Sequence, residues 1–164
     1  MVRELGYNTI SEVLDSWEAL RRIENYEEQA GLLLFRRLFD KSPRAKLLFG
    51  FPIDLDVHSD TIKNSRRFKA HAMYLIQMID SSLNMLGPDI ELLTEIMHAL
   101  GEKHARFGVL AEMYSQMGDA LIEAMTVLLG EGVMNEKVVE AWHETYGALS
   151  GDMIEEHIKY DQGE

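Results

Sequence analysis

Apolar residues recur along this chain at the three- and four-residue spacing of a helix face, and two histidines lie on such faces. His71 shares its face with Phe68 and Leu75, and His104 shares its face with Leu100. Both imidazoles are therefore predicted to point inward. An unpaired polar group in an apolar core costs about 1–3 kcal/mol, so each ring needs a partner. Two imidazoles on neighbouring helices can meet that need by binding one metal ion between them.

Helical spacing does not by itself assign a role to either histidine. A single inward histidine can equally be a core residue that bonds to a backbone carbonyl. His98 lies six residues before His104 on the same segment and is a rival metal ligand. We expect the remaining histidines at the surface; they are His58, His143 and His157.

The pattern predicts helices separated by short breaks, with no strand. Capping signals are expected at Thr9 with Glu12, Asn25 with Glu28, Ser42 with Pro43, and Asn135. The expected helices cover about 9–23, 26–39, 43–50, 60–86, 89–108, 110–129 and 136–156, with an irregular corner at 51–59. Gly101 is a possible break before His104, and Gly87–Pro88 is a strong stop. We expect a frayed tail from His157 to Glu164.

Composition favours one globular domain over residues 1–164, with 1–8 as an N-terminal extension and 158–164 as the tail. Because the chain has no cysteine, disulfides, thiolate ligands and thioether attachment are excluded. A net charge of −12 argues against nucleic acid or an anionic membrane as a partner. No apolar leader or run of about 20 apolar residues is present, so we expect a cytoplasmic protein.

Motifs around both histidines are similar to those of globins. The proximal-histidine segment of that family resembles LGEKHARFGV (100–109), and the distal-histidine segment resembles FKAHAMYL (68–75). SPRAKLLF (42–49) resembles the short C helix, and LLFRRLFDKSP places Phe35 at the B-helix position that covers the distal pocket. YSQMGDAL (114–121) and AWHETYGAL (141–149) resemble the G and H helices of the neuroglobin branch. The resemblance spans about 16–154 in the family's order, and it implies an all-α globin fold of seven or eight helices.

The resemblance also implies haem b, iron protoporphyrin IX, as the cofactor. His104 would be the fifth iron ligand, with its other ring nitrogen donating to a backbone carbonyl. His71 would either donate a hydrogen bond to bound oxygen or ligate the iron directly. Since Phe35 supplies no second donor, as in neuroglobin, a six-coordinate resting iron is expected. The residues at haem-lining positions are Phe35, Phe49, Leu75, Leu100, Phe107, Val109, Tyr114 and Met117.

Partners for the haem propionates are less well matched to the family. Lys103 and Arg106 flank the proximal histidine and are candidates. Neuroglobin has a lysine three residues after the distal histidine, where this chain has Tyr74, whose hydroxyl is the alternative.

Four functions are compatible with such a chain. It would bind oxygen, nitric oxide or carbon monoxide reversibly; act as a nitric oxide dioxygenase or nitrite reductase; sense a gas; or be a globin without haem. Enzymatic turnover would need an external reductase, because no flavin or nicotinamide domain is present. The acidic pairs Glu27–Glu28 and Glu155–Glu156 are adjacent in sequence and are expected to be solvated, not paired for catalysis.

Overall fold

Seven α-helices and one 3-10 helix form in residues 5–163, the part of the chain that this computed structural model describes. They are α1 (Tyr7–Arg21), α2 (Tyr26–Lys41), η2 (Pro43–Phe49), α3 (Asp60–Lys63), α4 (Arg66–Asn84), α5 (Ile90–Arg106), α6 (Met113–Leu129) and α7 (Glu136–Asp161). Because no strand occurs in this range, the predicted all-α class with seven or eight helices is confirmed. None of these helices is long and apolar enough to cross a membrane.

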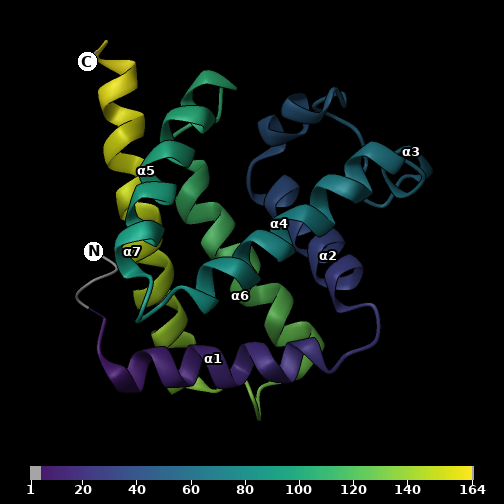
Figure 1. The fold of residues 1–164 in the computed structure, drawn as a ribbon. Helices are drawn as coiled ribbons and strands as arrows, with labels where there is room; N and C mark the ends of the chain where they lie inside the picture. The colour runs from purple at the N-terminus through teal and green to yellow at the C-terminus, as the bar shows by residue number, and fades with distance from the viewer. Residues whose placement is uncertain (1–4, 164) are drawn as a thin grey trace.

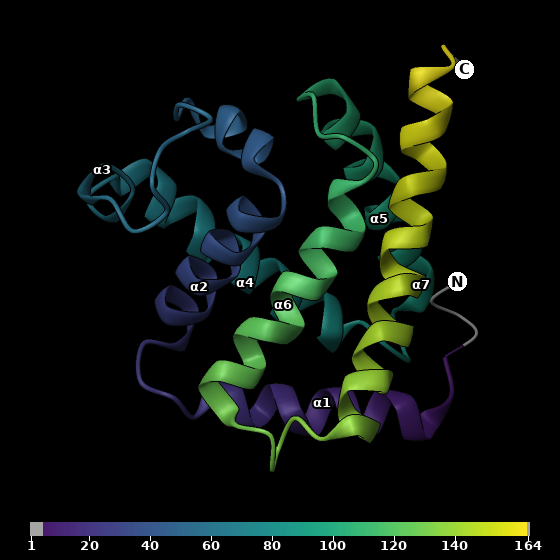
Figure 2. The same cartoon turned by 180° about the vertical axis from the view of Figure 1, so that it is seen from behind.

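α6 lies between two groups of helices, and α1 crosses it steeply. In Figure 1, α1 runs across one end of the molecule, below the ends of α6 and α7. Figure 2 shows α2 and α3 on one side of α6, and α5 and α7 on the other. α5 packs along α7, whereas α2 packs against both α4 and α6. Helices crossing at such angles can enclose a cofactor between them.

Two buried tryptophans join α1 to its neighbours. The ring centroids of Trp17 and Trp142 lie 5.8 Å apart, which couples α1 to α7. Trp142 donates its Nε1–H to Ser16 Oγ at 2.8 Å, and Trp17 donates to Asp80 Oδ1 on α4, also at 2.8 Å. Each buried indole N–H therefore has a partner, as large amphipathic rings require.

The helix that carries His71 is shorter than expected. The predicted run from about 60 divides into α3 and α4, because the Ser65 hydroxyl accepts a hydrogen bond from Phe68 N and caps a new helix. α4 then ends at Asn84, before Gly87, whose φ of +110° stops further helix.

The predicted caps have mixed outcomes. Asn135 accepts from Val138 N at 3.1 Å and caps α7 as expected. Asn25 and Ser42 stand at N-cap positions, but neither side chain makes the capping bond. The prediction for Thr9 is wrong: α1 begins at Tyr7, and Thr9 donates to Glu144 on α7 instead.

The expected break at Gly101 is also wrong, because α5 is continuous from Ile90 to Arg106. A Cβ at Gly101 would lie only 2.1 Å from the carbonyl oxygen of Met153. The glycine therefore permits α5 and α7 to approach closely, and it does not interrupt its helix.

The C-terminal part of α7 is helical to Asp161, four residues past the point where fraying was expected. His157 is only 2% exposed, so its predicted surface position is wrong. At the other end, residues 1–4 of the expected N-terminal extension lie outside the described residues, while Tyr7 and Asn8 belong to α1.

Candidate functional site

His71 on α4 and His104 on α5 are both held in the neutral state. Burial lowers the pKa of His104 to about 4, and charges at His157, His71 and Lys103 act in the same direction. Burial also lowers the pKa of His71, with Arg67 adding to the effect. The side chain of His71 is nevertheless exposed, so its predicted inward position is wrong, whereas His104 is partly buried. Neutral imidazoles offer the unshared electron pair that a metal ion needs.

Two phenylalanines pack against the ring of His71. The Phe35 and Phe49 ring centroids lie 5.8 and 5.2 Å from it. Phe68 packs behind them, 5.4 Å from Phe35 and 5.3 Å from Phe49. Among the described residues the His71 ring forms no hydrogen bond, so both its nitrogens are free to bind.

His104 faces a second set of polar groups on α6 and α7. Its Nδ1 lies 3.4 Å from the hydroxyl of Tyr114, which in turn lies 3.0 Å from Nδ1 of His157. His157 Nε2 lies 3.4 Å from Asp161 Oδ2. Burial and the charge of Asp161 raise the pKa of Tyr114 to about 12, so its hydroxyl keeps its proton. The contact of Nδ1 is therefore with a tyrosine hydroxyl, not with the backbone carbonyl that was expected.

His157 was missed by sequence reasoning although a signal existed. It lies four residues after Met153 and so continues the apolar face of the last helix. The partner that holds it, Tyr114, lies on a different helix and carries no sequence mark of that role.

The residues predicted to line a pocket fall into three groups by burial. Phe35 and Tyr114 are buried, and Phe107 at the end of α5 is 70% exposed. The others are partly buried against the core; they are Phe49, Leu75, Leu100, Val109 and Met117. Together they leave apolar surface on η2, α4, α5 and α6, the elements that carry or adjoin the two histidines.

The candidate propionate partners all lie at the surface. Tyr74 is 59% exposed, and Lys103 is also exposed. Arg106 contacts Glu102 Oε1 at 2.6 Å through one guanidinium nitrogen, so it already has an acidic partner. Lys103 and Tyr74 have no acidic partner among the described residues, and their role as propionate partners stays a prediction.

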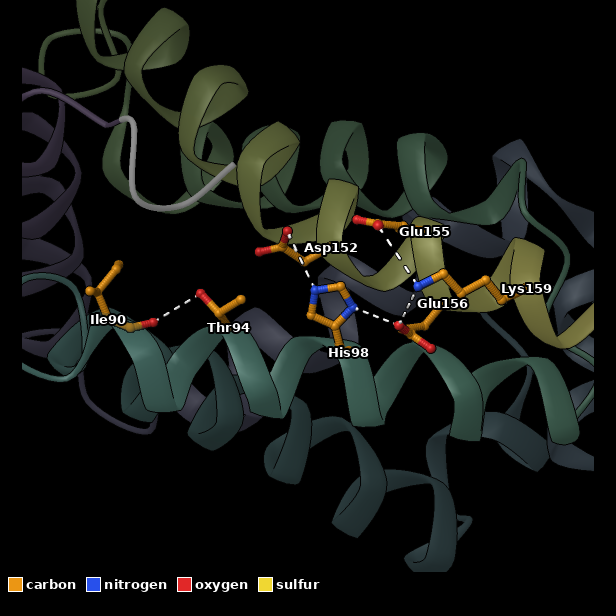
Figure 3. Close-up of polar contacts among 7 residues, drawn as sticks. All are labelled: Ile90, Thr94, His98, Asp152, Glu155, Glu156 and Lys159. Carbon is orange, nitrogen blue, oxygen red and sulfur yellow. Dashed lines mark hydrogen bonds and ion pairs between the residues drawn. The ribbon is translucent and has the colours of Figure 1, made fainter. Parts of the chain in front are cut away.

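His98 points away from the pair formed by His71 and His104. Six residues separate it from His104, a rotation of about 120° around the helix axis. Its ring faces α7, where Nδ1 lies 3.1 Å from Glu156 Oε1 (Figure 3). The rival assignment of His98 therefore has no geometric support, and the expectation that Glu156 is only solvated is wrong.

Comparisons with known proteins agree on one family. The family model for globins matches residues 32–153. The chain is 29% identical to the anaerobic nitrite reductase AHB2 of Arabidopsis thaliana over 152 residues, covering 90% of this chain and 91% of that protein. It is 25% identical to neuroglobin of Dissostichus mawsoni over 138 residues, covering 84% and 83%. The fold matches the crystal structure of a hexacoordinated haem protein from an anhydrobiotic tardigrade, with a TM-score of 0.79, 19% identity, and coverage of 94% and 96%.

Proposed function

Because the chain belongs to the globin family, we propose that it binds haem b and reversibly captures oxygen, nitric oxide or carbon monoxide at the iron. We propose His104 as the fifth ligand and His71 as a displaceable sixth ligand in the resting state. The observation that carries this proposal is the placement of two imidazoles on neighbouring helices: His71 on α4 packs against Phe35 and Phe49, and His104 on α5 faces the Tyr114 hydroxyl through Nδ1.

The residues present fit a haem group. Neutral imidazole is a common axial ligand for haem iron, and this chain has no cysteine to compete for that role. The partly buried apolar side chains on η2, α4, α5 and α6 suit a flat, largely apolar macrocycle, whose contact would remove their surface from water. When bound, the haem supplies the iron at which a diatomic ligand is held.

Tyr114 and His157 act on the orientation of His104 in this proposal. A hydrogen bond to the second nitrogen of a metal-bound imidazole fixes the ring and tunes its basicity. Tyr114 keeps its proton, and its hydroxyl lies between Nδ1 of His104 and Nδ1 of His157. It can therefore hold the ring of His104 in place. His157 is itself held from the far side by Asp161.

His71 has two roles open to it, and its surroundings favour direct ligation. Its neighbours Phe35 and Phe49 offer no hydrogen-bond donor, so His71 is the one polar group on that side among these contacts. Similarity to a neuroglobin and to a hexacoordinated tardigrade protein supports the same choice. An external ligand would then bind by displacing His71.

Replacing His71 with leucine is expected to convert a low-spin resting haem to a high-spin one. Leucine removes the sixth ligand while keeping the apolar contacts with Phe35 and Phe49. Visible absorption spectra of the ferric protein measure the change. His58→Leu, at an exposed histidine outside the site, is the control and should leave the spectrum unaltered. An unaltered spectrum in the His71 variant would exclude His71 as the sixth ligand.

A redox enzyme is the second candidate, favoured by the similarity to a plant nitrite reductase. Nitrite reduction or nitric oxide dioxygenation would require an external reductase, for which we propose a cytoplasmic partner. The two candidates separate in an anaerobic nitrite assay with a reconstituted electron donor. If nitrite is reduced no faster than the haem is reduced without an enzyme, the result would favour reversible ligand binding over a redox enzyme.

A further inference from the structure

A second group of metal-binding side chains lies between α5 and α7, on the side of α5 turned away from His104. One ligand atom from each of His98, Asp152 and Glu155 lies within 4.8 Å of the other two. Figure 3 shows the His98 ring standing between the two carboxylates of Asp152 and Glu156, with Glu155 on the same face of α7. The three residues belong to two helices, so the donors converge from opposite sides.

Asp152 is the observation that points to a ligand. It is only 1% exposed, and its Oδ2 atom is buried without a hydrogen-bond partner. Its other oxygen lies 3.9 Å from His98 Nε2, beyond hydrogen-bond distance. A buried carboxylate needs pairing, because the cost of removing the charge from water is several kcal/mol. A cation bound to this carboxylate would supply that pairing.

The close packing of the two helices creates the arrangement. Gly101 lies against the backbone of Met153, the residue after Asp152, and any side chain there would force α5 away from α7. The short separation brings His98, nearly one turn earlier on α5, opposite Asp152.

The charge balance also favours a divalent cation. Asp152, Glu155 and Glu156 bring three carboxylates, and within residues 5–163 Lys159 is the one lysine or arginine paired with them. Its Nζ lies 3.2 Å from Glu156 and 3.9 Å from Glu155, so these two carboxylates share one positive charge and Asp152 has no lysine partner. Three carboxylates and one lysine leave two negative charges.

We propose that His98, Asp152 and Glu155 bind a divalent transition-metal ion of the zinc type, separately from the haem. One imidazole nitrogen with carboxylate oxygens suits zinc, whereas calcium prefers six to eight oxygen ligands. Zinc bonds of about 2.0–2.2 Å require the donors to move closer together. Glu155 can supply that movement because its side chain is 48% exposed, and water would complete the four ligands.

Titration of the haem-loaded protein with Zn²⁺ alone, followed by calorimetry, tests this site. We expect one zinc ion per chain and a rise in unfolding temperature, with no change in the haem spectrum. His98→Gln and Glu155→Gln should each weaken zinc binding by at least about tenfold. Both residues are at least partly exposed, so these variants should fold. Asp152→Asn, which keeps the shape of a buried side chain, adds a third test.

His143→Gln is the matched control, since His143 is an exposed histidine on the same helix, outside the cluster. It should bind zinc like the unaltered protein. The proposal is overturned if the unaltered protein binds no zinc, or if the His98 and His143 variants bind it equally well. The comparison of these two variants does not depend on haem, so a failure of the haem proposal would be recognised separately.

Discussion

Replacing His104 with alanine is expected to accelerate the loss of haem by at least about tenfold, because the variant lacks the proposed fifth ligand. Alanine also removes the contact between Nδ1 of His104 and the Tyr114 hydroxyl, which orients the imidazole. His71 would remain as the only axial imidazole, on an element where no hydrogen bond fixes its ring. Transfer of haem to an excess of a haem-scavenging protein, followed by absorption, measures the rate.

His98→Ala is the control for this experiment, because His98 lies on the same helix and was the rival ligand. Its ring contacts Glu156 and α7, so its removal should leave the rate of haem loss within about twofold of the unaltered protein. Equal rates for the His104 and His98 variants would contradict the assignment of His104. Faster loss in the His98 variant alone would favour the rival.

Gly101→Ala is expected to destabilise the protein by about 1–3 kcal/mol, the usual cost of overpacking a well-packed contact. The added Cβ would lie 2.1 Å from the Met153 carbonyl oxygen, a backbone atom that cannot turn aside. α5 and α7 would have to separate, and α5 carries His104. Urea unfolding followed by circular dichroism gives the free energy of unfolding.

Gly147→Ala on α7 is the matched control. Nothing lies within 4 Å of a Cβ at that position, so alanine should stabilise the helix by about 0.5–1 kcal/mol. A Gly101 variant as stable as the unaltered protein would show that the two helices are less closely packed than the structure indicates.

The sequence was sufficient for the order of the helices and for the helices that carry His71 and His104, although His71 is exposed and His104 only partly buried. Both follow from spacing along one helix, which a single sequence records directly. The structural role of Gly101 could not be predicted from the sequence, because a glycine inside a helix can mark either a break or a close contact with another helix. The opposing backbone at Met153, far away in sequence, decides between them.

The hydrogen-bonded contacts of Tyr114 with His104 and His157 could not be predicted from residue spacing either. His157 was assigned to a frayed end, yet Tyr114 on α6 and Asp161 on α7 hold it in place. The same applies to His98 and Asp152, whose juxtaposition depends on how closely α5 and α7 pack. The capping prediction for Thr9 was wrong for a related reason, because its hydroxyl donates to Glu144 on α7 and does not cap its own helix.

The visible absorption spectrum of the purified protein tests the central claim most directly. It should be recorded for the ferric protein and for the ferrous protein without oxygen, before and after carbon monoxide is added. Haem held by His104 and His71 predicts sharp, split bands in the ferrous state that carbon monoxide replaces. A single broad ferrous band would contradict ligation by His71, and the absence of any haem band after reconstitution would contradict the proposed function itself.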